Sequence, residues 1–223
     1  MGRFRADEIE NYGSSNSSSF FQLKQNREVA RVRFMYNDLD DVEGYAVHEV
    51  EINGSRKYVS CLRNYNDPID VCPFCKNHQP VMAKLFIPVY NETQGRVQIW
   101  ERGKKFYQTL SSALSRGVPN GVPIVSQLFE IERQGEPKDT RTTYGIFPVG
   151  QADNTRLEDL PEKPEVLGRS VLDKSAEELD YFIHNGRFAD SGSAPMRRGS
   201  DYQSQQRNEV PIRRTPSRRE DVY

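Results

Sequence analysis

Two cysteines, Cys72 and Cys75, stand in the segment CPFCKNH, with His78 close behind them. Thiolates and imidazoles are the ligands that zinc prefers, but a lone C-x-x-C also occurs in redox motifs. The chain has one further cysteine, Cys61, and an odd total argues against a secreted disulfide framework. Whether the pair binds a metal therefore depends on which other residues the fold brings to it.

The segment 45–63 supplies two more candidate ligands. Asn53-Gly54 is a strong signal for a β-hairpin, and the residues on either side alternate in period two. A four-residue loop that begins at Asn53 would pair His48 with Cys61 on one face of the hairpin. Their Cβ atoms would then lie about 5 Å apart. The hairpin therefore predicts an imidazole and a thiol side by side.

The loop after this hairpin can carry Cys72 and Cys75 to meet His48 and Cys61. Three thiolates and one imidazole suit tetrahedral zinc. Four protein ligands leave no position for water, so we expect one structural zinc ion. Two alternatives remain at this point: His78 replaces His48, giving a compact C-x2-C-x2-H cluster, or the three cysteines are ordinary thiols.

The same residues do not fit a zinc deaminase, whose pattern is H-x-E followed by P-C-x-x-C. Val50 stands where that pattern has its glutamate, and Val71 stands where it has its proline. Cys61 would be an unwanted extra thiol. The sequence also shows no Ser/His/Asp set, no paired carboxylate motif and no phosphate loop. We therefore predict a protein that is not an enzyme.

The composition permits one substantial core with much polar sequence around it. The 223 residues are 35% hydrophobic and 28% charged, with a net charge of −1. A mean hydropathy of −0.79 indicates that a good part of the chain is not core. No run of about 18 apolar residues occurs, and the N-terminus lacks the apolar stretch of a signal peptide. We expect a soluble protein that makes no membrane contact and stays where it is made.

Strand-like runs alternate with turn residues through the middle of the chain. Such short strands at this spacing suggest a small barrel or sandwich. The runs cover residues 29–36, 45–52, 57–63, 83–90, 95–102, 124–133 and 141–149.

Two helices are also predicted. The first begins near Phe106 and stops at Gly117, since apolar residues recur there at helical spacing. The second opens with a capping box formed by Ser175 and Glu178 and closes at Gly186.

The chain divides into four parts by composition. A serine-rich flexible arm covers 1–19, and the core, 20–150, includes a zinc subdomain at about 45–80. An acidic segment with a short helix follows at 151–190, and a disordered basic tail covers 191–223. The acidic helix either docks on the barrel through Leu179, Phe182 and Ile183 or competes with a nucleic acid for a basic groove.

These features together resemble a known family. The segment VRFMYN, the H-x12-C hairpin, the CPFC loop, the strand pair that ends in GKKF and the helix after it cover residues 29–150. They resemble the zinc-containing, helix-destabilising single-stranded-DNA-binding proteins of tailed phages. The resemblance implies a mostly β protein with a five-stranded oligonucleotide-binding (OB) barrel and a zinc-bearing subdomain. It also implies His48, Cys61, Cys72 and Cys75 as the zinc ligands.

The resemblance further implies that the protein coats exposed strands in phage DNA replication, recombination and repair. Its partners would be single-stranded DNA, without marked sequence preference, and phage replication proteins in the cytoplasm of the bacterial host. The better-known members have a strongly basic N-terminal motif for self-association and a long acidic tail. Here only Arg3 and Arg5 precede acidic residues, and the chain ends in a basic stretch. Self-association on DNA therefore stays open.

Strand binding needs cations for phosphates and aromatic faces for bases, and the predicted strands interleave the two. Phe34, Phe86, Phe106 and Phe129 are the expected core aromatics, whereas aromatic residues with a polar group near strand ends are expected to meet bases. Trp100 enters on the family resemblance, which places a stacking aromatic before GKK. The predicted DNA-binding residues are Arg31, Arg33, Tyr36, Arg63, Tyr65, Lys84, Tyr90, Trp100, Arg102, Lys104, Lys105 and Tyr107.

An alternative function is a zinc-bearing protein-recruitment module of the replication or transcription machinery. In that case the barrel and the acidic helix would be docking surfaces for proteins. Charge reversal at Lys104 and Lys105 separates the two hypotheses, because only DNA binding predicts a loss of oligonucleotide affinity.

Overall fold

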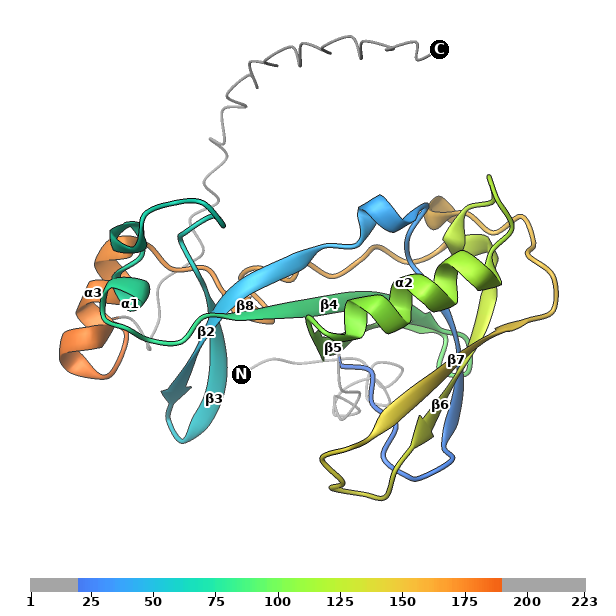
Figure 1. Cartoon of the computed structure of the whole chain (residues 1–223), viewed down its shortest axis with the longest axis horizontal. Coiled ribbons are helices and arrows are strands. Elements are labelled where there is room, and N and C mark those ends of the chain that lie inside the picture. Colours follow the sequence, from blue (N-terminus) through green and yellow to red (C-terminus); the bar gives the residue numbers. More distant parts are fainter. Residues whose placement is uncertain (1–19, 190–223) are drawn as a thin grey trace, which may run out of the picture. The chain divides into compact units, whose positions relative to one another are not determined.

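Residues 20–189 form an open, mixed sheet of eight strands with three α-helices packed around it (Figure 1). The computed structural model describes residues 20–189, so the predictions for the arm at 1–19 and the tail at 191–223 lie outside the described residues. The strands are β1 (Val29–Phe34), β2 (Gly44–Ile52), β3 (Ser55–Ser60), β4 (Met82–Asn91), β5 (Arg96–Gly103), β6 (Leu128–Gln134), β7 (Thr143–Val149) and β8 (Val171–Leu172). The α-helices are α1 (Pro73–Lys76), α2 (Phe106–Gly117) and α3 (Ala176–Asn185).

All seven predicted strand segments contain an observed strand, and the two predicted helices are confirmed. The segment 124–133 differs at its start, because Ile124–Ser126 forms a 3-10 turn and the strand begins at Leu128. The two-residue strand β8 was not predicted. It pairs in parallel with β3, where Val171 meets Tyr58. No helix among residues 20–189 is long and apolar enough to cross a membrane.

The strand order is β7-β6-β1-β4-β2-β3-β8, and β5 pairs with β4. The long strand β4 therefore serves two regions at once. Near Asn91 one of its edges pairs with β1, and near Met82 the same edge pairs with β2. Its other edge pairs with β5 from Lys84 to Asn91. In the described residues no ladder joins β5 to β7, so the sheet stays open instead of closing into a barrel.

The hairpin of β2 and β3 is tighter than we predicted. Ile52 pairs with Ser55 and His48 pairs with Val59, two residues away from the predicted register. The reason is the turn itself: Asn53 and Gly54 both adopt left-handed conformations, with φ of 52° and 72°, so two residues suffice to reverse the chain. A shift of two residues keeps each side chain on its predicted face.

The main core lies between the inner face of the sheet and α2. Its largest members that are fully buried are Trp100, Phe34 and Phe129. Helix α2 contributes Leu110 and Leu114, the two buried residues of its apolar face. It ends where predicted, at Gly117. Only glycine fits at that position, because a Cβ there would lie 2.7 Å from the Phe129 ring.

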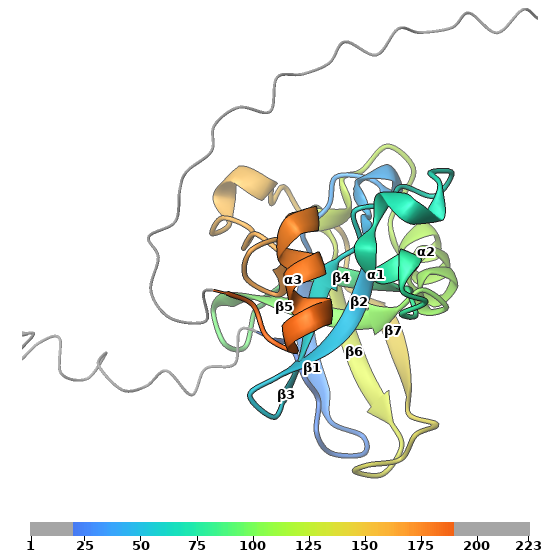
Figure 2. The same ribbon diagram turned by 90° about the vertical axis from the view of Figure 1, so that its left-hand side faces the viewer.

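Helix α3 begins and ends as its sequence predicted. The Ser175 hydroxyl accepts a hydrogen bond from the Glu178 amide, the Glu178 carboxylate accepts one from the Ser175 amide, and Gly186 ends the helix at φ 66°. Its docking surface differs from the expected one. Leu179 and Phe182 pack against Phe74 of α1, and both views show α1 beside α3 (Figures 1 and 2). The helix thus covers the region of the cysteines instead of a barrel.

Candidate metal centre and cationic cavity

Four side chains from three elements meet in one place. His48 lies on β2, Cys61 directly follows β3, and Cys72 and Cys75 bracket the first turn of α1. Their ligand atoms all lie within 4.8 Å of one another. The sequence CPFC folds this way because Pro73 is suited to the first helical position and a helical turn puts residues three apart on the same side.

The distances within the cluster fit a tetrahedral metal site. The Nε2 atom of His48 lies 3.5 Å from Cys72 Sγ and 3.6 Å from Cys75 Sγ, and Cys61 Sγ lies 3.5 Å from Cys75 Sγ. Ligands about 2.0 to 2.3 Å from a zinc ion would be about 3.5 to 3.8 Å apart. A disulfide needs about 2.05 Å, and all three cysteines are free. The cluster can hold a metal ion such as zinc.

The pKa shifts of His48 and Cys61 also favour a metal ion at the cluster. Burial lowers the pKa of His48, and its Nδ1 lies 3.1 Å from the Pro80 carbonyl oxygen. With a proton on Nδ1 donated to that carbonyl, Nε2 presents a lone pair to the thiols. Burial raises the pKa of Cys61 to about 12. Three thiolates this close need a cation among them, which a divalent metal supplies.

The choice between the two histidines is settled by position. His48 is fully buried beside the sulfur atoms, whereas His78 is exposed and does not belong to the cluster. His78 adopts a left-handed conformation, with φ 58°, just after α1. The compact C-x2-C-x2-H arrangement is therefore wrong, and the predicted set of His48 and the three cysteines comes together.

A row of aromatic side chains covers the four candidate ligands on one side. Phe74, fully buried between the two cysteines of α1, meets the His48 ring edge-on at 5.3 Å. On its other side it contacts Phe182 of α3 at 5.8 Å, and Phe182 stacks on Phe188 at 4.6 Å. We call residues 44–80 together with 171–189 the metal lobe. Its small core consists of these rings, the cysteines and a few aliphatic residues.

No known protein-family model and no curated protein matches the chain.

Three predicted DNA-binding residues lie in the interior. Trp100 is 0% exposed, with its ring enclosed by Phe21, Phe106 and Tyr144, so no base can stack on it. Tyr36 is 3% exposed and belongs to the main core. The prediction that bases stack on these two rings is wrong, because both rings are buried. The period-two pattern identified the faces of each strand but not which face the core occupies.

Arg33, the third of these residues, has a structural role in place of the predicted phosphate contact. It is 8% exposed and donates hydrogen bonds to Glu92 at 2.6 Å and to both carboxylate oxygens of Asp153, at 2.7 and 3.1 Å. It also donates to the carbonyls of Val125 and Ser126. All its donors are directed inward, so it fixes the segment after β7 onto the sheet.

The other predicted residues are divided between the surface and the polar contacts of the sheet. Tyr65 is 96% exposed in the loop before α1, and Lys104, Lys105 and Tyr107 are exposed at the start of α2. Arg31 is exposed 3.7 Å from Glu130. Lys84 donates to Glu101 and Tyr58, at 2.8 Å each. Arg63 and Tyr90 are half-buried.

A cavity of about 500 Å³ lies between residues 20–24, β5, β6 and the loop from β6 to β7. We call it the cationic cavity. The charged and aromatic residues that line it include Lys24, Glu101, Arg102, Arg133, Lys138 and Tyr144. Since Glu101 already pairs with Lys84 at 2.8 Å, the cationic charge predominates.

Arg102 is held flat in this cavity without a carboxylate partner. Its guanidinium lies 4.1 Å from the centroid of the Tyr144 ring and 4.7 Å from that of Trp100. One terminal nitrogen donates to the Glu101 carbonyl, while the buried Nε has no hydrogen-bond partner among residues 20–189. Burial lowers the pKa of Arg102, and the nearby Tyr144 and Glu101 offset only part of that effect.

Arg133 connects the walls of the same cavity. It donates to the carbonyls of Leu23, Gly135 and Glu136 and to the hydroxyls of Thr142 and Tyr144. Within the described part of the chain no carboxylate lies within 4.0 Å of either guanidinium.

Sequence reasoning identified Arg102 but missed Lys24, Arg133, Lys138 and Tyr144 as residues of this cavity. The sequence offered one signal, because Gly135 and Pro137 mark a turn before β7 and so place Lys138 in a loop.

Proposed function

We propose that the protein binds single-stranded DNA without marked sequence preference, as a zinc-bearing OB-type protein. In this proposal it protects strands during phage DNA replication, recombination and repair, in the cytoplasm of a bacterial host and alongside phage replication proteins. The family resemblance of residues 29–150 motivates the biological setting.

The strand connectivity supports an OB-type fold. Strands β1, β4 and β5 follow one another as neighbours, β6 returns to the free edge of β1, and β7 pairs with β6. Helix α2 lies between β5 and β6 in the chain, and the metal lobe is inserted largely between β1 and β4. The barrel would be partly open between β5 and β7. There the Arg102 guanidinium and Tyr144 ring bridge the two strands at 4.1 Å.

The observation that carries the proposal is the cationic cavity. OB-folds bind oligonucleotides on the face of their second and third strands and with the loop between the fourth and fifth. Here β5 takes the place of the third strand, and the loop from β6 to β7 supplies Lys138. The Arg102 guanidinium, which has no carboxylate partner, and the ammonium groups of Lys24 and Lys138 suit the phosphates of a strand. Arg133 adds positive charge to the same cavity, while its N–H groups bond to the protein.

Zinc has a structural role in this proposal. His48, Cys61, Cys72 and Cys75 would fill all four positions of the ion, so none remains for water or a substrate. The ion would fix the loop that carries the exposed Tyr65 relative to the sheet, which leaves that ring available to a base.

The test is a titration with an unstructured oligonucleotide at several salt concentrations. We expect the variant Lys24→Glu/Lys138→Glu to bind roughly tenfold more weakly, and its salt slope to fall by about 0.7 for each phosphate that it no longer neutralises. Lys57→Glu, at an exposed position of β3, is the matched control and should change neither quantity. Absence of binding at low salt, or equal affinity for duplex DNA, would show the proposed function to be wrong.

A further inference from the structure

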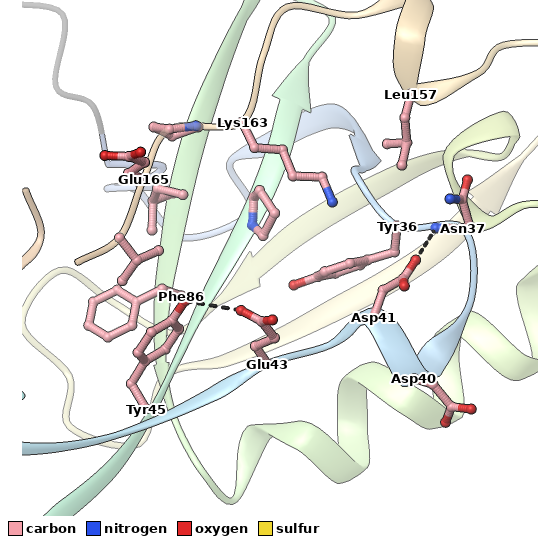
Figure 3. Close-up of a pocket in the computed structure, with 14 residues that line it drawn as sticks. Tyr36, Asn37, Asp40, Asp41, Glu43, Tyr45, Phe86, Leu157, Lys163 and Glu165 are labelled. Carbon is pink, nitrogen blue, oxygen red and sulfur yellow. Dashed lines mark hydrogen bonds between the residues drawn. The ribbon is translucent and has the colours of Figure 1, made fainter. Parts of the chain in front are cut away.

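A second cavity, of about 590 Å³, lies on the outer face of β4 and β5 and has the opposite charge (Figure 3). We call it the acidic cavity. Four carboxylates line it, from Asp40, Asp41, Glu43 and Glu165, against the single ammonium of Lys163. The carboxylates come from the connection between β1 and β2 and from the segment that leads to β8. The carboxylates would repel a phosphate, which argues against DNA as a ligand of the acidic cavity.

The wall of the acidic cavity is aromatic. Tyr36, Tyr45 and Phe86 line it, with the rings of Tyr45 and Phe86 edge-on at 5.6 Å. The Tyr45 hydroxyl donates to Glu43 at 3.1 Å, which holds that carboxylate against the ring. Aromatic faces beside carboxylates attract organic cations, because both the ring quadrupole and the negative charge favour them.

Tyr36 brings a hydroxyl without a protein partner into the cavity. The residue is 3% exposed, yet its ring extends into the cavity between Glu43 and Lys163 (Figure 3). Among residues 20–189, none hydrogen-bonds its hydroxyl. Burial, followed by Glu43, Tyr45 and Asp41, raises the pKa of Tyr36, so the hydroxyl stays neutral. The hydroxyl therefore reaches the cavity with its hydrogen-bonding capacity unused.

Lys163 shows how a cation can enter the acidic cavity. Its ammonium lies 5.4 Å from the centroid of the Tyr36 ring, within the range of a cation–π interaction. In the described residues Lys163 has no salt bridge, and its side chain is exposed. One ammonium at the rim leaves three of the four carboxylate charges uncompensated.

We propose that the acidic cavity binds an arginine side chain from an extended segment of a partner polypeptide. A planar guanidinium in the cavity can direct its N–H groups to Glu43 or Glu165 in a bidentate fashion, which an ammonium can do less well. The Tyr36 hydroxyl oxygen accepts one of these N–H groups. The volume holds more than one side chain, so the residues beside the arginine also enter. This site is distinct from the cationic cavity and adds a protein partner to strand binding.

The experiment uses the full chain and isothermal titration with a tri-arginine peptide that is acetylated and amidated, at low salt. We expect one site per chain and weaker binding of the matching tri-lysine peptide. Glu43→Gln and Glu165→Gln should each weaken tri-arginine about three- to fivefold. Tyr36→Phe keeps the ring and should weaken it about two- to tenfold. The control Glu177→Gln, an exposed acid of α3, should leave binding unchanged.

Three results would overturn the proposal. One is the absence of tri-arginine binding to the wild type at low salt. Another is equal weakening by Glu177→Gln or equal affinity for tri-lysine, which would mean general charge attraction. The third is displacement of the peptide by an oligonucleotide together with tighter oligonucleotide binding by Glu43→Gln, which would assign the cavity to DNA. The proposed function can fail in its own titration without affecting any of these outcomes.

Discussion

The main core and the core of the metal lobe are built in different ways. The main core joins large apolar residues from several strands and loops and from α2, and its fully buried members include Trp100, Phe34 and Phe129. The core of the metal lobe is smaller, and two of its buried members, Cys72 and Cys75, are candidate metal ligands. A core of that size is close to the limit of what burial alone can stabilise. Apolar burial therefore stabilises the main core, whereas we expect the metal lobe to depend on metal coordination.

Removal of a metal ligand should have the largest effect on stability, and that effect should be confined to the metal lobe. We expect His48→Ala to lose a bound zinc ion and, with it, binding free energy on the order of 10 kcal/mol that holds the lobe together. Limited proteolysis should then cut residues 44–80 and 171–189, while 82–149 stays protected. His78→Ala is the matched control, and metal content measured by mass spectrometry should stay at one equivalent. Loss of zinc from His78→Ala instead would mean that the cluster is not the metal site.

Truncation of a side chain in the main core should have the opposite effect: the free energy of unfolding should fall while zinc stays bound. Trp100→Ala removes the largest fully buried side chain, so we expect a loss of about 3–5 kcal/mol in the free energy of unfolding. Urea denaturation measures it, and the zinc content should not change. Tyr107→Ala, on the exposed side of α2, should stay within about 0.5 kcal/mol of the wild type. In the native wild type the buried indole should resist iodide quenching and should not respond to oligonucleotide.

Truncation of Phe182 separates the contribution of the aromatic rings in the metal lobe from that of the four metal ligands. Phe182→Ala removes the contact of α3 with Phe74, so we expect about 2–3 kcal/mol less protection of the α3 amides in hydrogen exchange. The four ligands are unchanged, and zinc should remain bound. Tyr181→Ala, an exposed neighbour on the same helix, is the control. Zinc loss from Phe182→Ala would show that the rings, and not only the ligands, hold the ion.

Acid should weaken the main core by a smaller amount through Asp153. Burial alone raises the pKa of Asp153, but hydrogen bonds from Thr155 and Arg33 outweigh it and lower that pKa to about 2. Because the folded-state pKa is depressed, the stabilisation is present above the ordinary value near 3.8 and is lost as pH falls towards 2. Urea midpoints between pH 5 and 2 should fall less in Asp153→Asn than in the wild type. Equal slopes would contradict a role for this carboxylate.

Local signals in the sequence predicted the metal ligands and the helix ends well. Asn53-Gly54 fixed a hairpin whose faces survive a register shift of two residues, so His48 and Cys61 stayed together. The capping box at Ser175 defined α3 because its hydrogen bonds are made within four residues. These features depend on neighbours along the chain, which a sequence shows directly.

Burial of the aromatic residues was harder to predict. Both faces of β4 and β5 are covered: Ile87 and Trp100 face the main core, while Phe86 and Ile99 meet Val166 and Val171 on the other side. Alternation identifies two faces, but both are apolar here, so it cannot tell an exposed ring from a buried one. The cationic cavity depends on contacts between residues more than a hundred positions apart, such as Arg133 with Leu23.

The position of α3 in the chain affects the order of events during synthesis. Phe74 and the four ligand residues leave the ribosome early, whereas Phe182, which covers Phe74, follows only after β4 to β7. A newly made chain therefore passes through a stage with its cysteines and an uncovered aromatic ring exposed. Capture of zinc at that stage would keep the thiols from oxidation while the later strands are translated. Metal supply during translation should accordingly affect the yield of folded protein, in addition to the stability of the finished metal lobe.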